Sequence, residues 1–161
     1  INPGLWTAAT STHFAHPGNR FYPALLRAGV LDAPVDPAAG MSEADRDRLR
    51  AAGIGITNVV RRATAKASEL TPAELRAGGA ELRALVVRAA PNVVAIAGIT
   101  AYRSAFGQPR AVTGRQPEPF EGAELWVVPN PSGLNAHETT ASLATAYAEP
   151  ARAAGVLRFG G

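Results

Sequence analysis

The sequence contains no cysteine, and Lys66 is its only lysine. Without cysteine, the chain has no disulfide framework, no cysteine–zinc or iron–sulfur site and no thiol nucleophile. Lys66 is the single candidate for Schiff-base chemistry, and it lies in a polar, basic segment without a recognisable motif. The chemistry of a functional site must therefore come mainly from other side chains.

Long hydrophobic runs and histidine are also scarce. No apolar run approaches the ~20 residues of a membrane span, and no signal peptide is visible, so we expect an intracellular protein without a membrane partner. A histidine-only metal site would need nearly all of the 3 histidines, and His13 and His16 have no further ligand nearby in the sequence. We expect neither a metal nor a cofactor.

Length and charge limit the number of domains and the kinds of partner. The 161 residues suit one folded unit, and we expect a single domain over residues 1–161. Lysine and arginine number 16 against 13 acidic residues, a formal net charge of +3. This mild excess permits a nucleic-acid partner without requiring one.

Capping residues and the spacing of apolar residues indicate the secondary structure. We expect helices over 19–28, 42–52, 71–89, 100–106 and 139–154, the last interrupted near its end by Pro150, and strands over 56–60, 92–98 and 125–128. Ile1 runs directly into the turn residues Asn2, Pro3 and Gly4, so we expect the first strand to be truncated before Ile1. The alternation of short strands with helices predicts an α/β fold, a three-layer sandwich with a mostly parallel central sheet flanked by helices.

Common catalytic motifs are absent. The chain has no GxxxxGK(S/T), no GxGxxG after a strand, no GxSxG and no HExxH. Most carboxylates lie on polar helix faces or in loops, which does not favour a hydrolase with paired carboxylates. What remains are amide and aromatic side chains near the ends of predicted strands, where ligands bind in open α/β sheets.

Asn2 and Phe14 are the first such candidates. Asn2 follows the predicted strand end, and its carboxamide can orient a water molecule; the alternative is a turn cap. Phe14 lies in a loop bounded by glycine and proline, where its ring either stacks on a base or fills the core.

A second candidate is the segment Asn130-Pro131-Ser132-Gly133-Leu134. Its main-chain N–H groups and the Ser132 hydroxyl suit a phosphate, and Leu134 is an apolar side chain that can wedge into a duplex. The alternative is an ordinary proline–glycine turn.

Together these segments are more specific than any of them alone. The chain resembles the mismatch-specific uracil/thymine DNA glycosylases in three places. Their first motif is similar to residues 1–5 (INPGL) and 14–21 (FAHPGNRF). Their middle strand is similar to residues 55–60 (GITNVV), and their DNA-insertion loop to residues 130–134 (NPSGL). These segments occur in the family's order and approximate spacing. The resemblance implies the fold of the uracil-DNA glycosylase superfamily, in agreement with the α/β pattern.

The resemblance also implies residue roles. Asn2 would position the attacking water. The base would be held by the main chains of Ile1 and Phe14, the Phe14 ring, and the pocket residues Thr7, His13 and Asn58. The DNA would be contacted by Asn130, Ser132, Gly133, Leu134 and Asn135, with Ser132 on a phosphate and Leu134 in the space that the base vacates. Some relatives carry a basic residue two positions after the wedge, where this chain has Ala136.

The expected function is therefore a monofunctional DNA repair glycosylase. It would flip uracil, or thymine or ethenocytosine, out of G-mismatched double-stranded DNA and leave an abasic site. The resemblance further implies a monomeric, bacterial-type protein that works at the nucleoid. The alternatives are a non-catalytic base- or nucleotide-binding module on the same fold and, less favoured, a small-nucleoside hydrolase, which would normally use an aspartate cluster.

Overall fold

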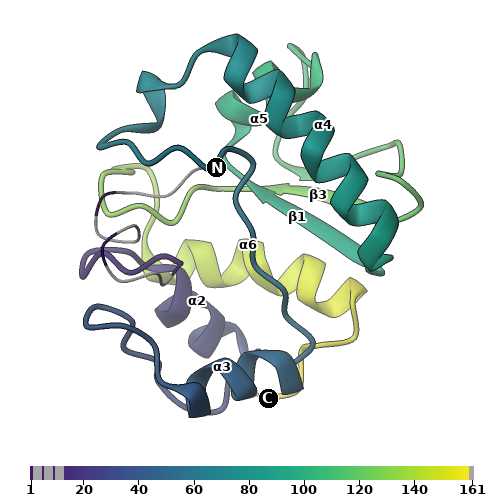
Figure 1. Cartoon of the computed structure of the whole chain (residues 1–161). Coiled ribbons are helices and arrows are strands. Elements are labelled where there is room, and N and C mark those ends of the chain that lie inside the picture. The colour runs from purple at the N-terminus through teal and green to yellow at the C-terminus, as the bar shows by residue number, and fades with distance from the viewer. Residues whose placement is uncertain (2–4, 6–8, 10–12, 160–161) are drawn as a thin grey trace. The chain divides into compact units, whose positions relative to one another are not determined.

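The computed structural model describes residues 1, 5, 9 and 13–159. The chain forms two compact units (Figure 1). Among the described residues, the first unit contains Ile1 and 58–130, and the second contains 5, 9, 13–57 and 131–159. Each unit has its own helices.

The first unit is built on a small mixed sheet. Its elements are η1 (Ala67–Glu69), α4 (Pro72–Ala89), β1 (Val93–Ala97), α5 (Ile99–Phe106), β2 (Gly114–Arg115) and β3 (Glu124–Val128). The described strands lie in the order β1-β3-β2, with β1 parallel and β2 antiparallel to β3. The predicted mostly parallel sheet is therefore not confirmed, because the loop before β3 turns back and adds a short antiparallel partner.

The expected strand over 56–60 is wrong. Residues 56–60 have no strand conformation, although the Val60 N–H donates to the Ile1 carbonyl at 3.0 Å. Val59 and Val60 are buried because α4 packs closely on them at Gly78. A Cβ at position 78 would lie only 2.2 Å from the Val59 carbonyl oxygen. Val59 and Val60 are thus apolar because they contact a helix. A short apolar run in the sequence does not distinguish such a contact from a buried strand.

Helix α4 begins as its sequence predicts. The Thr71 hydroxyl accepts from the Glu74 N–H at 3.1 Å, and the Glu74 carboxylate accepts from the Thr71 N–H at 2.8 Å. This reciprocal pair is a capping box, with Pro72 at the first helical position. The cap fixes where the helix starts and therefore which residues face the core.

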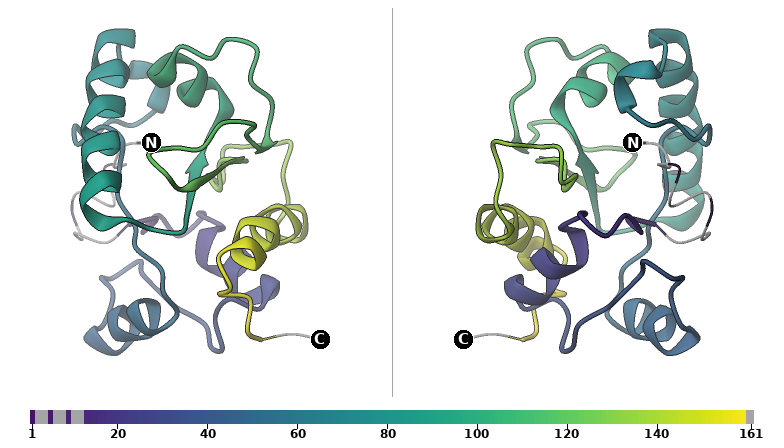
Figure 2. Two further views of the ribbon diagram at one scale, coloured as in Figure 1. Left: turned by 90° about the vertical axis from the view of Figure 1, so that its right-hand side faces the viewer. Right: turned by 90° about the vertical axis from the view of Figure 1, so that its left-hand side faces the viewer.

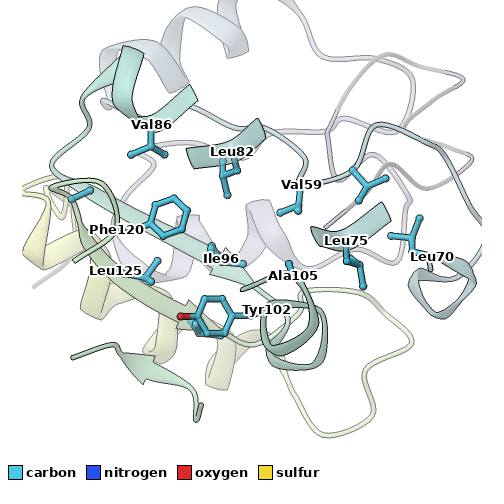
Figure 3. Close-up of a cluster of buried hydrophobic side chains, with 13 residues drawn as sticks. Val59, Leu70, Leu75, Leu82, Val86, Ile96, Tyr102, Ala105, Phe120 and Leu125 are labelled. Carbon is cyan, nitrogen blue, oxygen red and sulfur yellow. The ribbon is translucent and has the colours of Figure 1, made fainter. Parts of the chain in front are cut away.

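The core of the first unit lies between α4, α5 and the sheet (Figure 3). Leu82 and Val86 from α4 point toward Phe120, Ile96 and Leu125. Burial of each such side chain contributes about 1.5–3 kcal/mol. This packing holds the carboxyl end of β3, from which the chain continues into the segment singled out above.

The second unit consists of helices α2 (Phe21–Ala28), α3 (Glu43–Ala51) and α6 (Thr140–Ala153). Helix α2 packs along α6 (Figures 1 and 2). Leu143 and Tyr147 lie on the buried face of α6, as their spacing predicts. Gly29 ends α2 with a φ of 85°, the left-handed conformation that favours glycine.

Pro150 does not interrupt α6, contrary to expectation. The helix runs through it to Ala153, and the Pro150 carbonyl accepts from the Ala154 N–H at 2.9 Å. Because the proline lies in the last turns, the missing N–H affects only one helical hydrogen bond. In the described part of the chain, no helix is both long and apolar enough to cross a membrane.

Candidate nucleic-acid interface

The predicted site residues are distributed over both units. The first unit holds Ile1, Asn58 and Asn130. The second unit holds His13, Phe14, Ser132, Gly133, Leu134 and Asn135. Asn2 and Thr7 lie outside the described residues. The structure brings the Phe14 segment and the Ser132–Asn135 segment together within the second unit, and these two form the candidate interface.

In the first unit, Ile1 packs against the hydrophobic core, and its carbonyl oxygen accepts from Val60. Asn58 is half-buried two residues before Val60, and Asn130 is half-buried two residues after β3 ends. All three residues therefore lie on backbone that the core of this unit holds in place.

Phe14 is held in an unusual conformation. Its φ of 56° lies in the left-handed region, which costs a residue with a side chain about 1–2 kcal/mol. Its ring stacks on Phe21 with centroids 4.0 Å apart and planes 25° apart, and it is T-shaped to the Tyr22 ring with centroids 6.4 Å apart. Such pairs contribute about 0.5–1.5 kcal/mol beyond burial. Phe14 is half-buried, so its ring is anchored on one face by Phe21 and is not enclosed by the core.

His13 lies beside a cavity of about 310 Å³ in the second unit, together with Tyr22, Met41 and Arg46. The Tyr22 hydroxyl donates to the His13 carbonyl oxygen at 2.9 Å. Burial raises the pKa of Tyr22 to about 12, so its hydroxyl stays protonated at neutral pH. Burial also lowers the pKa of His13, which favours a neutral imidazole.

Residues 131–138, here named the wedge loop, begin with the fully buried Pro131. The Ser132 hydroxyl accepts from the Leu134 N–H at 3.2 Å, and the Ser132 carbonyl accepts from the Asn135 N–H at 3.0 Å. The Leu134 side chain is 79% exposed. An apolar side chain therefore projects from a turn that is hydrogen-bonded at both sides.

Arg20 is the residue that the sequence analysis did not single out. Its guanidinium donates to the main-chain carbonyls of Ser132, Asn135 and Glu138 in the wedge loop. Its own N–H donates to the carbonyl of Pro131 at 3.0 Å. Arg20 occurs within the quoted segment 14–21, but nothing in that segment indicates acceptors more than a hundred residues away; the nearest acceptor of its guanidinium, Ser132, is separated from it by 112 positions.

The described residues contain no group of three or more histidine, aspartate or glutamate side chains that could hold a metal ion. The candidate interface instead offers aromatic faces, a neutral imidazole, an exposed apolar tip and main-chain groups. These are the means by which proteins contact bases and the sugar–phosphate backbone.

Comparison with known protein families agrees with this chemistry. The model of the family described as "Uracil DNA glycosylase superfamily" matches residues 1–151, which span both units. The match confirms the superfamily and the α/β class inferred from the sequence, whereas the mismatch-specific subfamily remains a prediction. Members of this superfamily are typically glycosylases, hydrolases that act on DNA in repair, and the chain belongs to the uracil-DNA glycosylase superfamily.

Proposed function

We propose that the protein is a monofunctional uracil-DNA glycosylase that removes uracil from G·U mismatches in double-stranded DNA. The observation that carries the proposal is the wedge loop, whose leucine is 79% exposed although the loop itself is tied down by hydrogen bonds. An exposed leucine has no folding role to account for it, and a held apolar tip suits insertion between stacked bases.

Base flipping gives both Leu134 and Phe14 a role. A base inside a duplex is out of reach of an active site, so it is extruded at a cost of a few kcal/mol, which is smallest for a mismatch. Leu134 would occupy the space that the base leaves. Phe14, already stacked on Phe21 by one face, would stack the uracil on its other face for about 1–3 kcal/mol.

The hydrolysis needs an oriented water molecule and stabilisation of the leaving base. The bond between C1′ and the uracil nitrogen breaks, and its electron pair leaves with the base as an anion. The water oxygen bonds to C1′, and its surplus proton passes through solvent to the departed base. Asn2 would orient this water through its carboxamide; an amide does not titrate near neutral pH, so it is no general base. Asn2 lies outside the described residues, and its role rests on the resemblance.

A neutral His13 suits the anionic leaving group. The neutral imidazole donates one N–H, which is enough to hydrogen-bond a uracil carbonyl oxygen that gains negative charge. Burial lowers the pKa of His13, so this neutral form predominates at pH 7. Lys66 is exposed at the N-cap of the 3₁₀ helix η1 and is not among the candidate interface residues, so we propose no lyase step.

Recognition of the opposite guanine is proposed to fall to Asn135. Ala136 has no polar side chain, although some relatives carry a basic residue at the corresponding position. Asn135 accepts from the His137 N–H through its Oδ1 at 3.2 Å, which fixes the orientation of its amide. An asparagine NH₂ carries two N–H donors, which suit a guanine edge or a phosphate.

The test is single-turnover excision by Asn2→Ala and Asn2→Asp on a G·U duplex, with melting temperatures measured in parallel. If Asn2 orients the water, Asn2→Ala slows excision by at least ~100-fold without a matching loss of melting temperature, and Asn2→Asp retains more activity than Asn2→Ala. If Asn2 is only a turn cap, Asn2→Ala costs about 1 kcal/mol of stability and the rate hardly changes. Tight DNA binding without excision by the wild type would instead indicate a non-catalytic binding module.

A further inference from the structure

We propose that Arg20 is a positioning residue that holds the wedge loop in the shape required for insertion into DNA. The inference rests on the proposed function, because it takes Leu134 as the inserting side chain. It goes further in naming the residue that keeps Leu134 in place.

The geometry of the contact is specific to the wedge loop. Nη2 of Arg20 donates to the carbonyl oxygens of Ser132 at 2.6 Å and Asn135 at 2.8 Å, and Nη1 donates to that of Glu138. These acceptors are three residues apart because the loop makes two successive turns. In the first turn Asn135 N–H donates to Ser132, and in the second Glu138 N–H donates to Asn135. The Arg20 side chain therefore donates hydrogen bonds to carbonyl oxygens of both turns.

Arginine suits this position better than any other residue. Three carbonyl oxygens pointing at one place repel each other, and a cation with a planar fork of donors satisfies all of them at once. The arrangement has a cost, because Nε of Arg20 is buried without a hydrogen-bond partner among the described residues. A lysine would supply the charge but not the fork.

Arg20 also couples the wedge loop to the Phe14 segment. Its own N–H donates to the Pro131 carbonyl at 3.0 Å, and the next residue, Phe21, stacks on the Phe14 ring with centroids 4.0 Å apart. Two adjacent residues at the start of α2 thus hold the two groups that would act on DNA. Leu134 would push into the duplex while Phe14 receives the base.

This coupling predicts a dependence on the type of substrate. Insertion into a stacked duplex requires a loop that is already ordered, since a loop that becomes ordered only on binding loses conformational entropy at that step. Excision from single-stranded DNA needs no insertion. Loss of Arg20 should therefore affect duplex substrates far more than single strands.

The experiment compares Arg20→Gln and Arg20→Lys with Arg27→Gln, which removes the same charge from the exposed last turn of the same helix. Single-turnover excision is measured on a G·U duplex and on a single-stranded uracil oligonucleotide. We expect Arg20→Gln to slow duplex excision at least ~10-fold, since misplacement of a reacting group by about 1 Å can cost ~100-fold, with little change on the single strand. Arg20→Lys should restore part of the duplex rate, and Arg27→Gln should behave like the wild type.

Hydrogen exchange of the free protein provides a readout that does not need activity. The Asn135 and Glu138 N–H groups should exchange faster in Arg20→Gln than in the wild type or Arg27→Gln. Unchanged exchange, or equal loss of rate on both substrates together with a lower melting temperature, overturns the proposal. If the wild type excises uracil from neither substrate, the proposed function fails, and faster exchange in Arg20→Gln then supports the loop-holding role alone.

Discussion

Gly133 lies so close to Gly18 that a Cβ at position 133 would stand 2.6 Å from the Gly18 carbonyl oxygen. Non-bonded atoms do not approach this closely, and the obstacle is main chain, which cannot rotate away as a side chain can. The wedge loop and the segment before α2 are therefore in direct contact, and position 133 is limited to glycine for steric reasons.

Gly133→Ala should displace the wedge loop. We expect slower excision of uracil from a G·U duplex and a moderate loss of stability, about 1–3 kcal/mol, as for other overpacked positions. The measurements are single-turnover rates and chemical denaturation. Gly55→Ala is the matched control for stability, because a Cβ there meets nothing within 4 Å. Equal behaviour of the two variants would show that the loop absorbs the extra atom.

Leu134→Ala should leave stability unchanged and impair duplex excision. Its side chain is 79% exposed, so its truncation removes little buried surface, whereas unstacking a base step costs a few kcal/mol that an inserted side chain helps to offset. We expect the largest loss for uracil in a well-paired A·U context and the smallest for single-stranded DNA. Val112→Ala, which truncates an exposed apolar side chain in the first unit, is the control. A parallel loss on all substrates would argue against insertion.

The sequence was most informative where local chemistry decides structure. Thr71 with Glu74 forms the predicted capping box, the apolar run at 92–98 contains β1, and the run at 125–128 makes up all of β3 except its first residue. These features depend on neighbouring residues, so a pattern within one segment is sufficient to find them.

The sequence was least informative where contacts are distant in the chain. Val59 and Val60 are buried where α4 packs on them at Gly78, and their apolar pattern alone does not distinguish this packing from a buried strand. The sequence does not indicate the role of Arg20, because its acceptors are main-chain carbonyls and every residue has one. Asn2 was a candidate from its place after a predicted strand end and Thr7 from the family resemblance, and both lie outside the described residues.

Stability should depend on pH through Glu74. A hydrogen bond from the Arg62 side chain, together with one from the Thr71 main chain, lowers the pKa of Glu74 from 4.5 to about 2. A lowered pKa in the folded state means that this contribution is complete above pH ~4.5 and is lost as the pH falls toward 2.

Glu74→Gln keeps the capping shape but removes this dependence. The difference in unfolding free energy between wild type and Glu74→Gln should be constant near neutral pH and shrink as the pH falls from 4.5 toward 2. Urea denaturation at a series of pH values measures it. Glu81→Gln removes the same charge from the same helix and controls for net charge. A difference that stays constant down to pH 2 would contradict the assignment.

The last prediction separates the two roles considered for Phe14. Phe14→Ala and Phe14→Gly both remove the ring, and both lose its stack on Phe21, about 0.5–1.5 kcal/mol. They differ in the backbone, because alanine keeps the strain at a φ of 56° and glycine does not. Relief of about 1–2 kcal/mol of strain outweighs the ~0.5–1 kcal/mol that glycine loses in chain entropy, so Phe14→Gly should be the more stable variant.

Activity should not follow this difference in stability. If the ring stacks on the flipped base, both variants lose the same 1–3 kcal/mol or so of base binding, and their excision rates under subsaturating, single-turnover conditions fall together. If Phe14 instead only fills space beside Phe21, the rates should follow the melting temperatures, and Phe14→Gly should be the faster enzyme. Phe14→Leu keeps apolar volume without an aromatic face, so its failure to restore the rate would confirm that stacking, and not bulk, is what the base requires.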